Sequence, residues 1–326
     1  MIKDSTVMVT GGCGFVGSHL VDGLVDAGAS KIIVIDNLFL HKAGHIMPRW
    51  ANPQVIFYKV DAQNFDKMMN VFMKEDVNIV YNLAVMPLPH SLEDPITNYN
   101  NNVGIVLTLL QLLKEGFYRK LIHFSSSEVY GSCQVAPMDE THPYSPSTVY
   151  ATSKHACDDL INCYRKLYNV ECAIIRPFNL YGPRQNKSSY AGIIPRTIEK
   201  ILRGDCVQVY GDGKQTRDYT YVSDVVRAAV LMGNNWEKAE GETFVVASGK
   251  ETEIGYLVQK ICDIYSHENR SKNDIKIEYL PARDGDVRRH IGCPYKIKDA
   301  LGFEPSILLD SGLINTIKWY MSKGEI

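Results

Sequence analysis

The sequence has almost no excess charge of either sign. Its 35 lysine and arginine residues nearly balance its 37 aspartate and glutamate residues, and the formal net charge is -2. A protein that binds nucleic acid or an anionic membrane surface usually carries a strongly basic patch. We therefore expect neither as a partner, and any anionic ligand must be held by a few local charges.

Several other features are missing. No apolar run approaches the roughly 20 residues that cross a bilayer, and no charged-then-apolar leader follows Met1. The eight cysteines form no Cys-x-x-Cys pair, so we expect reduced thiols, with neither disulfides nor a bound metal. No internal repeat or low-complexity linker is present. Together these absences predict a cytoplasmic protein without a membrane partner.

A glycine-rich turn follows the first predicted strand. Thr6 to Thr10 is β-branched and typical of a strand, and a helix is predicted over 18–27. Gly11, Gly14 and Gly17 lie between them, and this spacing between a strand and a helix is typical of dinucleotide binding. Gly11 permits the tight turn, Gly14 lets a pyrophosphate approach the backbone, and Gly17 lets helix and strand pack closely. A glycine-rich turn without a ligand is the alternative.

Carboxylates end the next two predicted strands. Asp36 lies about 20 positions after the third glycine, where a carboxylate meets the ribose hydroxyls of an adenosine. Its charge would repel a 2′-phosphate, so we expect NAD rather than NADP. Asp61 could accept from the adenine amino group, although a surface carboxylate is nearly as good an interpretation. The small residues around Leu83 and Ala84 would let the cofactor lie across the strand ends.

A tyrosine and a lysine four residues apart provide the candidate chemistry. Tyr150 and Lys154 lie on one face of a predicted helix, one turn from each other. The ammonium of Lys154 is expected to lower the pKa of Tyr150, so that the phenolate can act as a general base on a substrate hydroxyl. Ser126 is expected to bind the same oxygen. The predicted cofactor contacts are Gly11, Gly14, Phe15, Val16, Gly17, Asp36, Asn37, Asp61, Ala62, Leu83, Ala84, Tyr150 and Lys154.

The alternation of strands and helices predicts an α/β fold, a Rossmann-type doubly wound parallel sheet. We expect residues 1–177 to form the NAD-binding domain, with 214–248 returning to it, and 178–326 to form mainly a smaller α/β substrate-binding lobe. The segment 85–95 contains prolines and a histidine, so it is predicted to be a loop over the site rather than a helix.

The motifs together resemble those of a known family. The chain is similar, along nearly its whole length, to extended short-chain dehydrogenases/reductases of the nucleotide-sugar epimerase/dehydratase/decarboxylase family. This resemblance implies a tightly bound NAD, a nucleoside-diphosphate sugar in the cleft and a homodimer. It is carried by the glycine turn, Asp36, Ser125 to Gly131 (SSSEVYG), Tyr150 with Lys154, Arg176 to Arg184 (RPFNLYGPR), Tyr210 to Tyr219 (YGDGKQTRDY) and Arg283 to Arg288 (RDGDVR).

The resemblance also implies roles for individual residues. The implied catalytic residues are Ser126, Ser127, Glu128, Tyr150 and Lys154. The substrate-binding candidates are Pro87, His90, Asn179, Arg184, Arg217 and Arg288. Arg217 and Arg288 fall on positions that pair with a diphosphate, and a surface ion pair is the alternative for each. For His90, a solvated loop histidine is the better interpretation.

The position of Glu128 bears on the reaction. In similar 4,6-dehydratases a glutamate here removes the C5 proton after oxidation at C4, whereas simple 4-epimerases usually have no acid at this position. Ser127 departs from the dTDP-glucose dehydratases, which carry an aspartate there, and matches the GDP-sugar type. We therefore favour an NDP-hexose 4,6-dehydratase over a 4-epimerase and a uronic-acid decarboxylase. A structural role for Glu128 as a turn cap, and a non-catalytic NAD-binding sensor or scaffold, are further alternatives.

Overall fold

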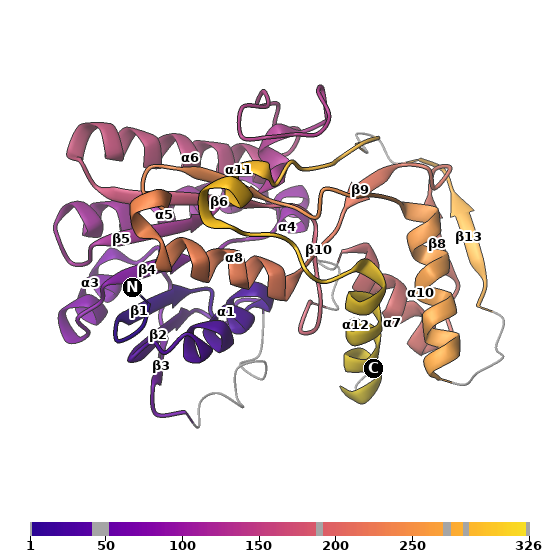
Figure 1. The fold of residues 1–326 in the computed structure, drawn as a ribbon, viewed down its shortest axis with the longest axis horizontal. Helices are drawn as coiled ribbons and strands as arrows, with labels where there is room; N and C mark the ends of the chain where they lie inside the picture. The colour runs from indigo at the N-terminus through magenta and orange to yellow at the C-terminus, as the bar shows by residue number, and fades with distance from the viewer. Residues whose placement is uncertain (1, 41–51, 187–191, 270–274, 283–286, 324–326) are drawn as a thin grey trace.

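Two packed parts of unequal size make up the molecule, with the larger at the left of Figure 1 and the smaller at the right. The computed structural model describes residues 2–40, 52–186, 192–269, 275–282 and 287–323. The N-terminal half builds most of the larger part, which segments within residues 222–246 and 295–301 complete, and other segments after residue 180 build the smaller part.

A seven-stranded parallel sheet organises the larger part. Its strands are β1 (Thr6–Thr10), β2 (Lys31–Asp36), β3 (Val55–Lys59), β4 (Ile79–Asn82), β5 (Lys120–Phe124), β6 (Glu171–Pro177) and β11 (Thr243–Val246). They lie in the order β11-β6-β5-β4-β1-β2-β3. The direction of winding reverses between β1 and β4, and in such sheets the ligand crevice opens at the carboxyl ends of the strands at that point. The predicted doubly wound α/β fold is confirmed.

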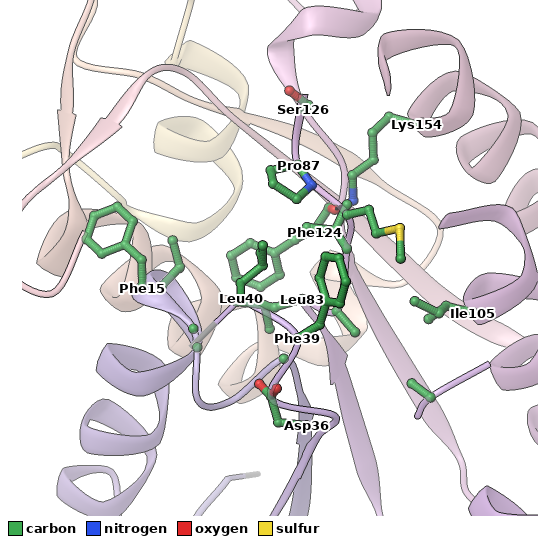
Figure 2. A pocket seen from close by; sticks show the side chains of 18 of the residues that line it. Phe15, Asp36, Phe39, Leu40, Leu83, Pro87, Ile105, Phe124, Ser126 and Lys154 are labelled. Atoms are coloured by element: carbon green, nitrogen blue, oxygen red, sulfur yellow. Dashed lines mark hydrogen bonds between the residues drawn. The ribbon is translucent and has the colours of Figure 1, made fainter. Parts of the chain in front are cut away.

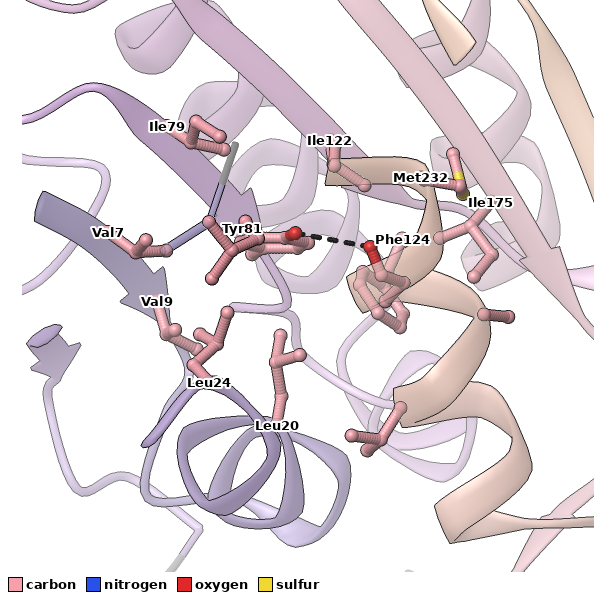
Figure 3. Packing of buried hydrophobic residues seen from close by; sticks show 14 of the residues in the cluster. Val7, Val9, Leu20, Leu24, Ile79, Tyr81, Ile122, Phe124, Ile175 and Met232 are labelled. Carbon is pink, nitrogen blue, oxygen red and sulfur yellow. Dashed lines mark hydrogen bonds between the residues drawn. The ribbon is translucent and has the colours of Figure 1, made fainter. Parts of the chain in front are cut away.

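Helices cover both faces of this sheet. One face packs on α1 (Phe15–Asp26), α8 (Val222–Asn234), α9 (Trp236–Ala239) and α11 (Tyr295–Leu301). The other face packs on α3 (Phe65–Lys74), α5 (Pro95–Lys114) and α6 (Val149–Tyr168). Successive strand residues alternate between the two cores, so Val7 and Val9 face α1 while Met8 faces α3 and α5. Figure 3 shows the first core, where the buried hydroxyl of Tyr81 donates to the carbonyl of Ala229 at 3.1 Å.

The smaller part has its own core, built by three helices that pack together (Figure 1). These are α7 (Ile193–Arg203), α10 (Ile254–Glu268) and α12 (Leu309–Lys323). Its short strands pair as β7 (Leu180–Tyr181) with β10 (Thr220–Tyr221), β9 (Thr216–Asp218) with β12 (Glu251–Glu253), and β8 (Val207–Tyr210) with β13 (Ile277–Leu280). Phe15 and Val16 of α1 pack against this core, so the glycine turn lies where the two parts meet.

Two sequence-based expectations about helices are wrong. The segment 85–95 is not simply a loop, because it contains α4 (Leu88–Glu93). Its prolines lie where helices begin: Pro87 is the N-cap of α4, Pro89 is in its first turn, and Pro95 starts α5. Proline has no backbone N–H, and at these positions no hydrogen bond within the helix is lost, because the first N–H groups of a helix have no acceptor there. The helix predicted over 18–27 begins earlier, at Phe15, directly after the glycine turn.

In the part of the chain that the structure describes, no helix is both long and apolar enough to cross a membrane. The same residues contain no group of three or more histidine, cysteine, aspartate or glutamate side chains placed to hold a metal ion. Each of the eight cysteines carries a free thiol.

Candidate active site

The glycine turn between β1 and α1 has no room for side chains at two of its positions. Gly11 has a φ of +67°, and a Cβ there would lie 2.8 Å from the backbone nitrogen of Ala84. A Cβ on Gly17 would lie 2.1 Å from the carbonyl oxygen of Gly11. Gly14 is the N-cap of α1, whose first N–H groups have no partners within the helix. This backbone can therefore approach a pyrophosphate closely and donate hydrogen bonds to it.

Asp36 holds the turn from the end of β2. Its carboxylate accepts hydrogen bonds from the backbone N–H of Cys13 at 3.0 Å and of Leu38 at 2.8 Å. Burial raises the pKa of Asp36, and these two bonds counteract the rise. Each carboxylate oxygen keeps acceptor capacity for a ribose hydroxyl. Asn37, the next residue, donates to the carboxylate of Asp61 at 3.2 Å, which connects two further predicted contacts.

Replacement of Asp36 by asparagine should weaken NAD binding about tenfold and reduce the preference for NAD over NADP. The substitution removes the charge that repels a 2′-phosphate, and one carboxylate oxygen becomes an NH₂ group that cannot accept from a backbone N–H. Isothermal titration with both dinucleotides measures the two effects. Asp66→Asn, on the first turn of α3, is the matched control. An unchanged preference in Asp36→Asn would show that another group selects the cofactor.

A cavity of about 390 Å³ extends from this turn to the end of β5. Figure 2 shows Asp36 at one end, Ser126 and Lys154 at the other, and Phe39 and Leu83 between them. The predicted site residues that line this single cavity are Gly11, Gly14, Phe15, Val16, Gly17, Asp36, Asn37, Asp61, Ala62, Leu83, Ala84, Pro87, Ser126, Ser127, Glu128, Tyr150, Lys154 and Asn179. The dinucleotide turn and the candidate catalytic residues therefore share one continuous space.

Tyr150 and Ser126 meet at the inner end of the cavity. Thr148 caps α6 by accepting from the N–H of Ala151, which places Tyr150 in the first turn of the helix. The hydroxyl groups of Tyr150 and Ser126 are hydrogen-bonded, and this contact lowers the pKa of Tyr150. Burial outweighs it, and the pKa of Tyr150 is raised overall. Ser126 thus lies where it can bind the oxygen that exchanges a proton with Tyr150.

The ammonium of Lys154 donates to the carbonyl of Phe124 at 2.6 Å. Burial lowers the pKa of Lys154. The expected effect of Lys154 on the pKa of Tyr150 stays a prediction. The four-residue spacing places both residues on one face of α6, but it does not determine which acceptor the long side chain chooses.

Glu128 enters the same cavity from a short helical turn, η2 (Ser127–Tyr130). The side chain of Ser126 caps this turn by accepting from the N–H of Glu128 at 3.2 Å, so the cap comes from the serine rather than from the glutamate. Burial raises the pKa of Glu128, and the positive charge of Arg217 opposes the rise. The charge of Glu128 also raises the pKa of Tyr150. A second proton-transfer group therefore faces the same space as Tyr150.

Four predicted substrate contacts lie outside this cavity. Arg217 lines a second cavity of about 290 Å³, which shares Asn179 with the first. Arg288 forms a two-point ion pair with Asp212, at 2.7 and 3.0 Å, and its side chain is 64% exposed, as in the surface-pair alternative. The last two candidates are also elsewhere: Arg184 pairs with Asp22 of α1 at 2.7 Å, and His90 is buried with its ring edge-on to Phe39.

The sequence analysis missed several cavity residues. Among them, Phe39 and Leu40 come from the segment after β2, and Gln185 and Asn186 come from the turn after β7. No local pattern marks them, because chain folding alone brings these segments together. The nearest signal in the sequence is the stretch Arg176 to Arg184, which carries part of the family resemblance and ends one residue before Gln185.

A buried ion pair contacts both ends of the candidate catalytic turn, Ser125 to Tyr130. Arg176 on β6 and Asp158 on α6 are each 1% exposed and meet at 2.9 Å. Arg176 also donates to the hydroxyl groups of Tyr130 and Tyr144, and Ser125 donates to Asp158 at 2.8 Å. Because buried charges need partners, these bonds to Oδ2 of Asp158 and from Arg176 fix the ends of the Ser125–Tyr130 segment. Arg176 lies in the stretch quoted for the family resemblance, but its partners come from elsewhere in the chain.

The chain is similar to known proteins over nearly its whole length. The family model described as GDP-mannose 4,6 dehydratase matches residues 8–316. The UDP-glucose 4-epimerase of Mycolicibacterium smegmatis is 31% identical over 98% of this chain and 99% of its own.

Two solved structures have nearly the same fold. The UDP-glucose 4-epimerase of Thermotoga maritima, solved with UDP-glucose, has a TM-score of 0.89 and 32% identity, covering 98% of this chain and 100% of its own. The dTDP-glucose 4,6-dehydratase of Streptomyces venezuelae, solved with NAD, has a TM-score of 0.89 and 27% identity, covering 97% of both chains.

Proposed function

The chain belongs to the nucleotide-sugar epimerase/dehydratase family of extended short-chain dehydrogenases/reductases, and from this we propose that it is an NDP-hexose 4,6-dehydratase. NAD is the cofactor of this family, and when bound it supplies a hydride acceptor that returns the hydride within the same turnover. The bare glycine backbone at Gly11 and Gly17 and the carboxylate of Asp36 fit its pyrophosphate and adenosine ribose.

The substrate is proposed to span both cavities. Asn179 lines each of them, and the guanidinium of Arg217 lies in the wall of the second. A sugar placed beside Tyr150 would therefore direct its diphosphate toward Arg217, where charge-assisted hydrogen bonds are available. The nucleoside would occupy the remainder of the second cavity, between Tyr219 and Ile194.

The proposed chemistry uses three side chains in sequence. Tyr150 takes the proton of the C4 hydroxyl while Ser126 binds its oxygen, and C4 becomes a ketone as its hydride would pass to bound NAD. The ketone acidifies the neighbouring C5–H, and Glu128 removes that proton. The C6 hydroxyl then leaves as water, and the double bond left between C5 and C6 would take back the hydride at C6 and a proton at C5. Because the hydroxyl of Ser127 is too weak an acid for this step, the proton on Glu128 is the one available to the leaving oxygen.

One observation carries the choice of dehydratase: the carboxylate of Glu128 lines the same cavity as Tyr150 and Ser126. Burial and the charge of Arg217 are what shift its pKa, with no contribution from a hydrogen bond. A raised carboxyl pKa suits a group that first takes a proton and then gives it back. Rotation of a ketone and return of hydride, as in a 4-epimerase, would not need this group.

A 4-epimerase is the second candidate. Two of the compared proteins, at 31% and 32% identity, carry that name. Ser127 also occupies the position where dTDP-glucose dehydratases have an aspartate. Its presence removes one argument for the elimination of water, and so for a dehydratase. In this case Tyr150 and Ser126 would keep their roles and Glu128 would have no catalytic part.

The rate of dehydration should depend on the ionisation of Glu128. Its carboxylate is the base, and burial raises its pKa above the ordinary 4.5. kcat should therefore fall as the pH drops through this raised pKa, at a higher pH than an exposed glutamate would give. Because Arg217 lowers the pKa of Glu128, Arg217→Gln should move the acid limb of the kcat profile further up. A limb at the same pH in both proteins would exclude Glu128 as the titrating base.

Mass spectrometry with a panel of substrates tests the proposed function. The purified enzyme would be incubated with NAD and with UDP-, GDP-, dTDP- and CDP-linked hexoses, N-acetylhexosamines and uronic acids. Loss of one water from a hexose is the expected result, and the substrate that reacts names the nucleotide. An isomer of unchanged mass would make the enzyme an epimerase, and loss of carbon dioxide would make it a decarboxylase. No reaction with any substrate would overturn the assignment.

A further inference from the structure

His290 is a buried histidine behind the catalytic turn, and the proposed mechanism does not use it. Its ring is 2% exposed and packs against Phe178, with ring centroids 4.7 Å apart. Nδ1 lies 3.3 Å from the amide nitrogen of Asn179. The ring is also hydrogen-bonded to the backbone of Ser127. His290 therefore touches one residue of the cavity wall and the backbone of another.

The direction of these two hydrogen bonds defines the state of the ring. The amide nitrogen of Asn179 also donates to the carbonyl of Asp218 at 3.0 Å, which identifies it as the NH₂ group. Since NH₂ can only donate, Nδ1 of His290 must accept, and the ring proton must be on Nε2. The ring is also hydrogen-bonded to the backbone of Ser127. Because Nε2 carries the only proton of the ring, it is Nε2 that donates this bond, and the backbone carbonyl of Ser127 accepts it.

The ring stays neutral because of its surroundings. Burial lowers the pKa of His290 to about 4, and the charges of Arg217 and His142 act in the same direction. A protonated ring would also lose the acceptor that Asn179 needs. The pattern of one accepted and one donated hydrogen bond is therefore available throughout the neutral pH range.

The segment that carries His290 is held on both sides. The carbonyl of Arg288 accepts from the N–H of Thr216 at 3.0 Å, and the carbonyl of Ile291 accepts from the N–H of Met138 at 2.9 Å. Gly292 is pressed against Phe178, because a Cβ there would lie 2.9 Å from that ring. The backbone around His290 is therefore fixed, and so is the position of its ring. The ring in turn fixes the two groups that it bonds, the backbone of Ser127 and the amide of Asn179.

We propose that His290 is a positioning residue that holds the catalytic turn and Asn179 in register with each other. Its donated bond sets the carbonyl of Ser127, which lies between Ser126 and Glu128. Its accepted bond orients the amide of Asn179, which lines both cavities. The catalytic and substrate-binding roles in this inference rest on the proposed function. The bridge itself, meaning the two hydrogen bonds that join His290 to Ser127 and to Asn179, does not depend on that function.

Two substitutions separate the two halves of the bridge. Glutamine can place a donor near the position of Nε2, and asparagine can place an acceptor near that of Nδ1. With the substrate found in the panel, His290→Gln should keep kcat within about threefold and raise KM about tenfold. His290→Asn should keep KM within about threefold and lower kcat about tenfold or more, because the turn of Glu128 loses its anchor. Equal losses in both parameters for both variants, with lowered unfolding midpoints, would reduce His290 to a packing residue.

Nitrogen-15 NMR of the imidazole rings tests the bridge without any turnover. Comparison of the wild-type protein with His290→Gln assigns the His290 signals. We expect a neutral ring with the proton on Nε2 from about pH 6 to pH 8. A ring protonated at pH 7, or one with the proton on Nδ1, would overturn the proposal. If the wild-type enzyme converts no sugar nucleotide, the proposed function fails. The NMR measurement still shows whether the His290 ring has the tautomer that the bridge requires.

Discussion

Tyr150→Phe should reduce kcat by about 10³-fold or more while leaving NAD binding nearly unchanged. The substitution removes only the hydroxyl group that is hydrogen-bonded to Ser126, and phenylalanine keeps the ring that packs at the start of α6. Without this hydroxyl the base assigned to the C4 proton is missing. Every later step depends on the ketone, so epimerisation and dehydration should both disappear.

The measurement is steady-state turnover together with calorimetric NAD titration of the same preparation. Tyr256→Phe is the control, because Tyr256 is 55% exposed on α10 and lines neither cavity. Retention of half the wild-type rate by Tyr150→Phe would contradict the assigned base. An unchanged cellular function in the same variant would instead support a non-catalytic NAD-binding sensor or scaffold.

Glu128→Gln should abolish dehydration, by about 10³-fold, and still permit oxidation at C4. Glutamine has the size and hydrogen-bonding reach of glutamate but cannot accept the C5 proton. The expected signature is a substrate that exchanges or epimerises at C4 without loss of water. If C5 deprotonation is blocked, solvent deuterium should also no longer enter C5.

Glu140→Gln is the matched control for this variant. Burial raises the pKa of Glu140 as it does that of Glu128. Glu140 accepts a hydrogen bond from the N–H of Val245 at 2.6 Å, a bond that a glutamine oxygen can keep. It does not line the cavity. Equal loss of water by Glu128→Gln and the wild-type enzyme would return Glu128 to a structural role.

The parts of the site that depend on local geometry were predictable from the sequence. Gly11 and Gly17 have no space for a Cβ, so their spacing carries a steric requirement that can be recognised without coordinates. Asp36 is the last residue of β2, so its place at the carboxyl end of the strand could be read from the strand pattern alone. Tyr150 and Lys154 share a helical face for the same kind of reason.

The parts that depend on tertiary contacts were not predictable. The pKa of Tyr150 is governed by burial, which depends on how α6 packs. Arg217 and Arg288 occur in comparable motifs, yet Arg217 lines a cavity while Arg288 pairs with Asp212 at the surface. His290 bonds to a residue 111 positions earlier in the chain. No periodicity or spacing contains such information.

The most direct test of the account follows a deuterium atom placed at C4 of the reactive NDP-hexose. The proposed 4,6-dehydratase removes this atom as hydride and returns it to C6 of the same molecule. We therefore predict a product lighter by one water that carries the deuterium in its C6 methyl group, detected by mass spectrometry and deuterium NMR. Deuterium found again at C4 of an isomer of unchanged mass would show an epimerase and contradict the role of Glu128. Deuterium lost to water would contradict hydride transfer itself.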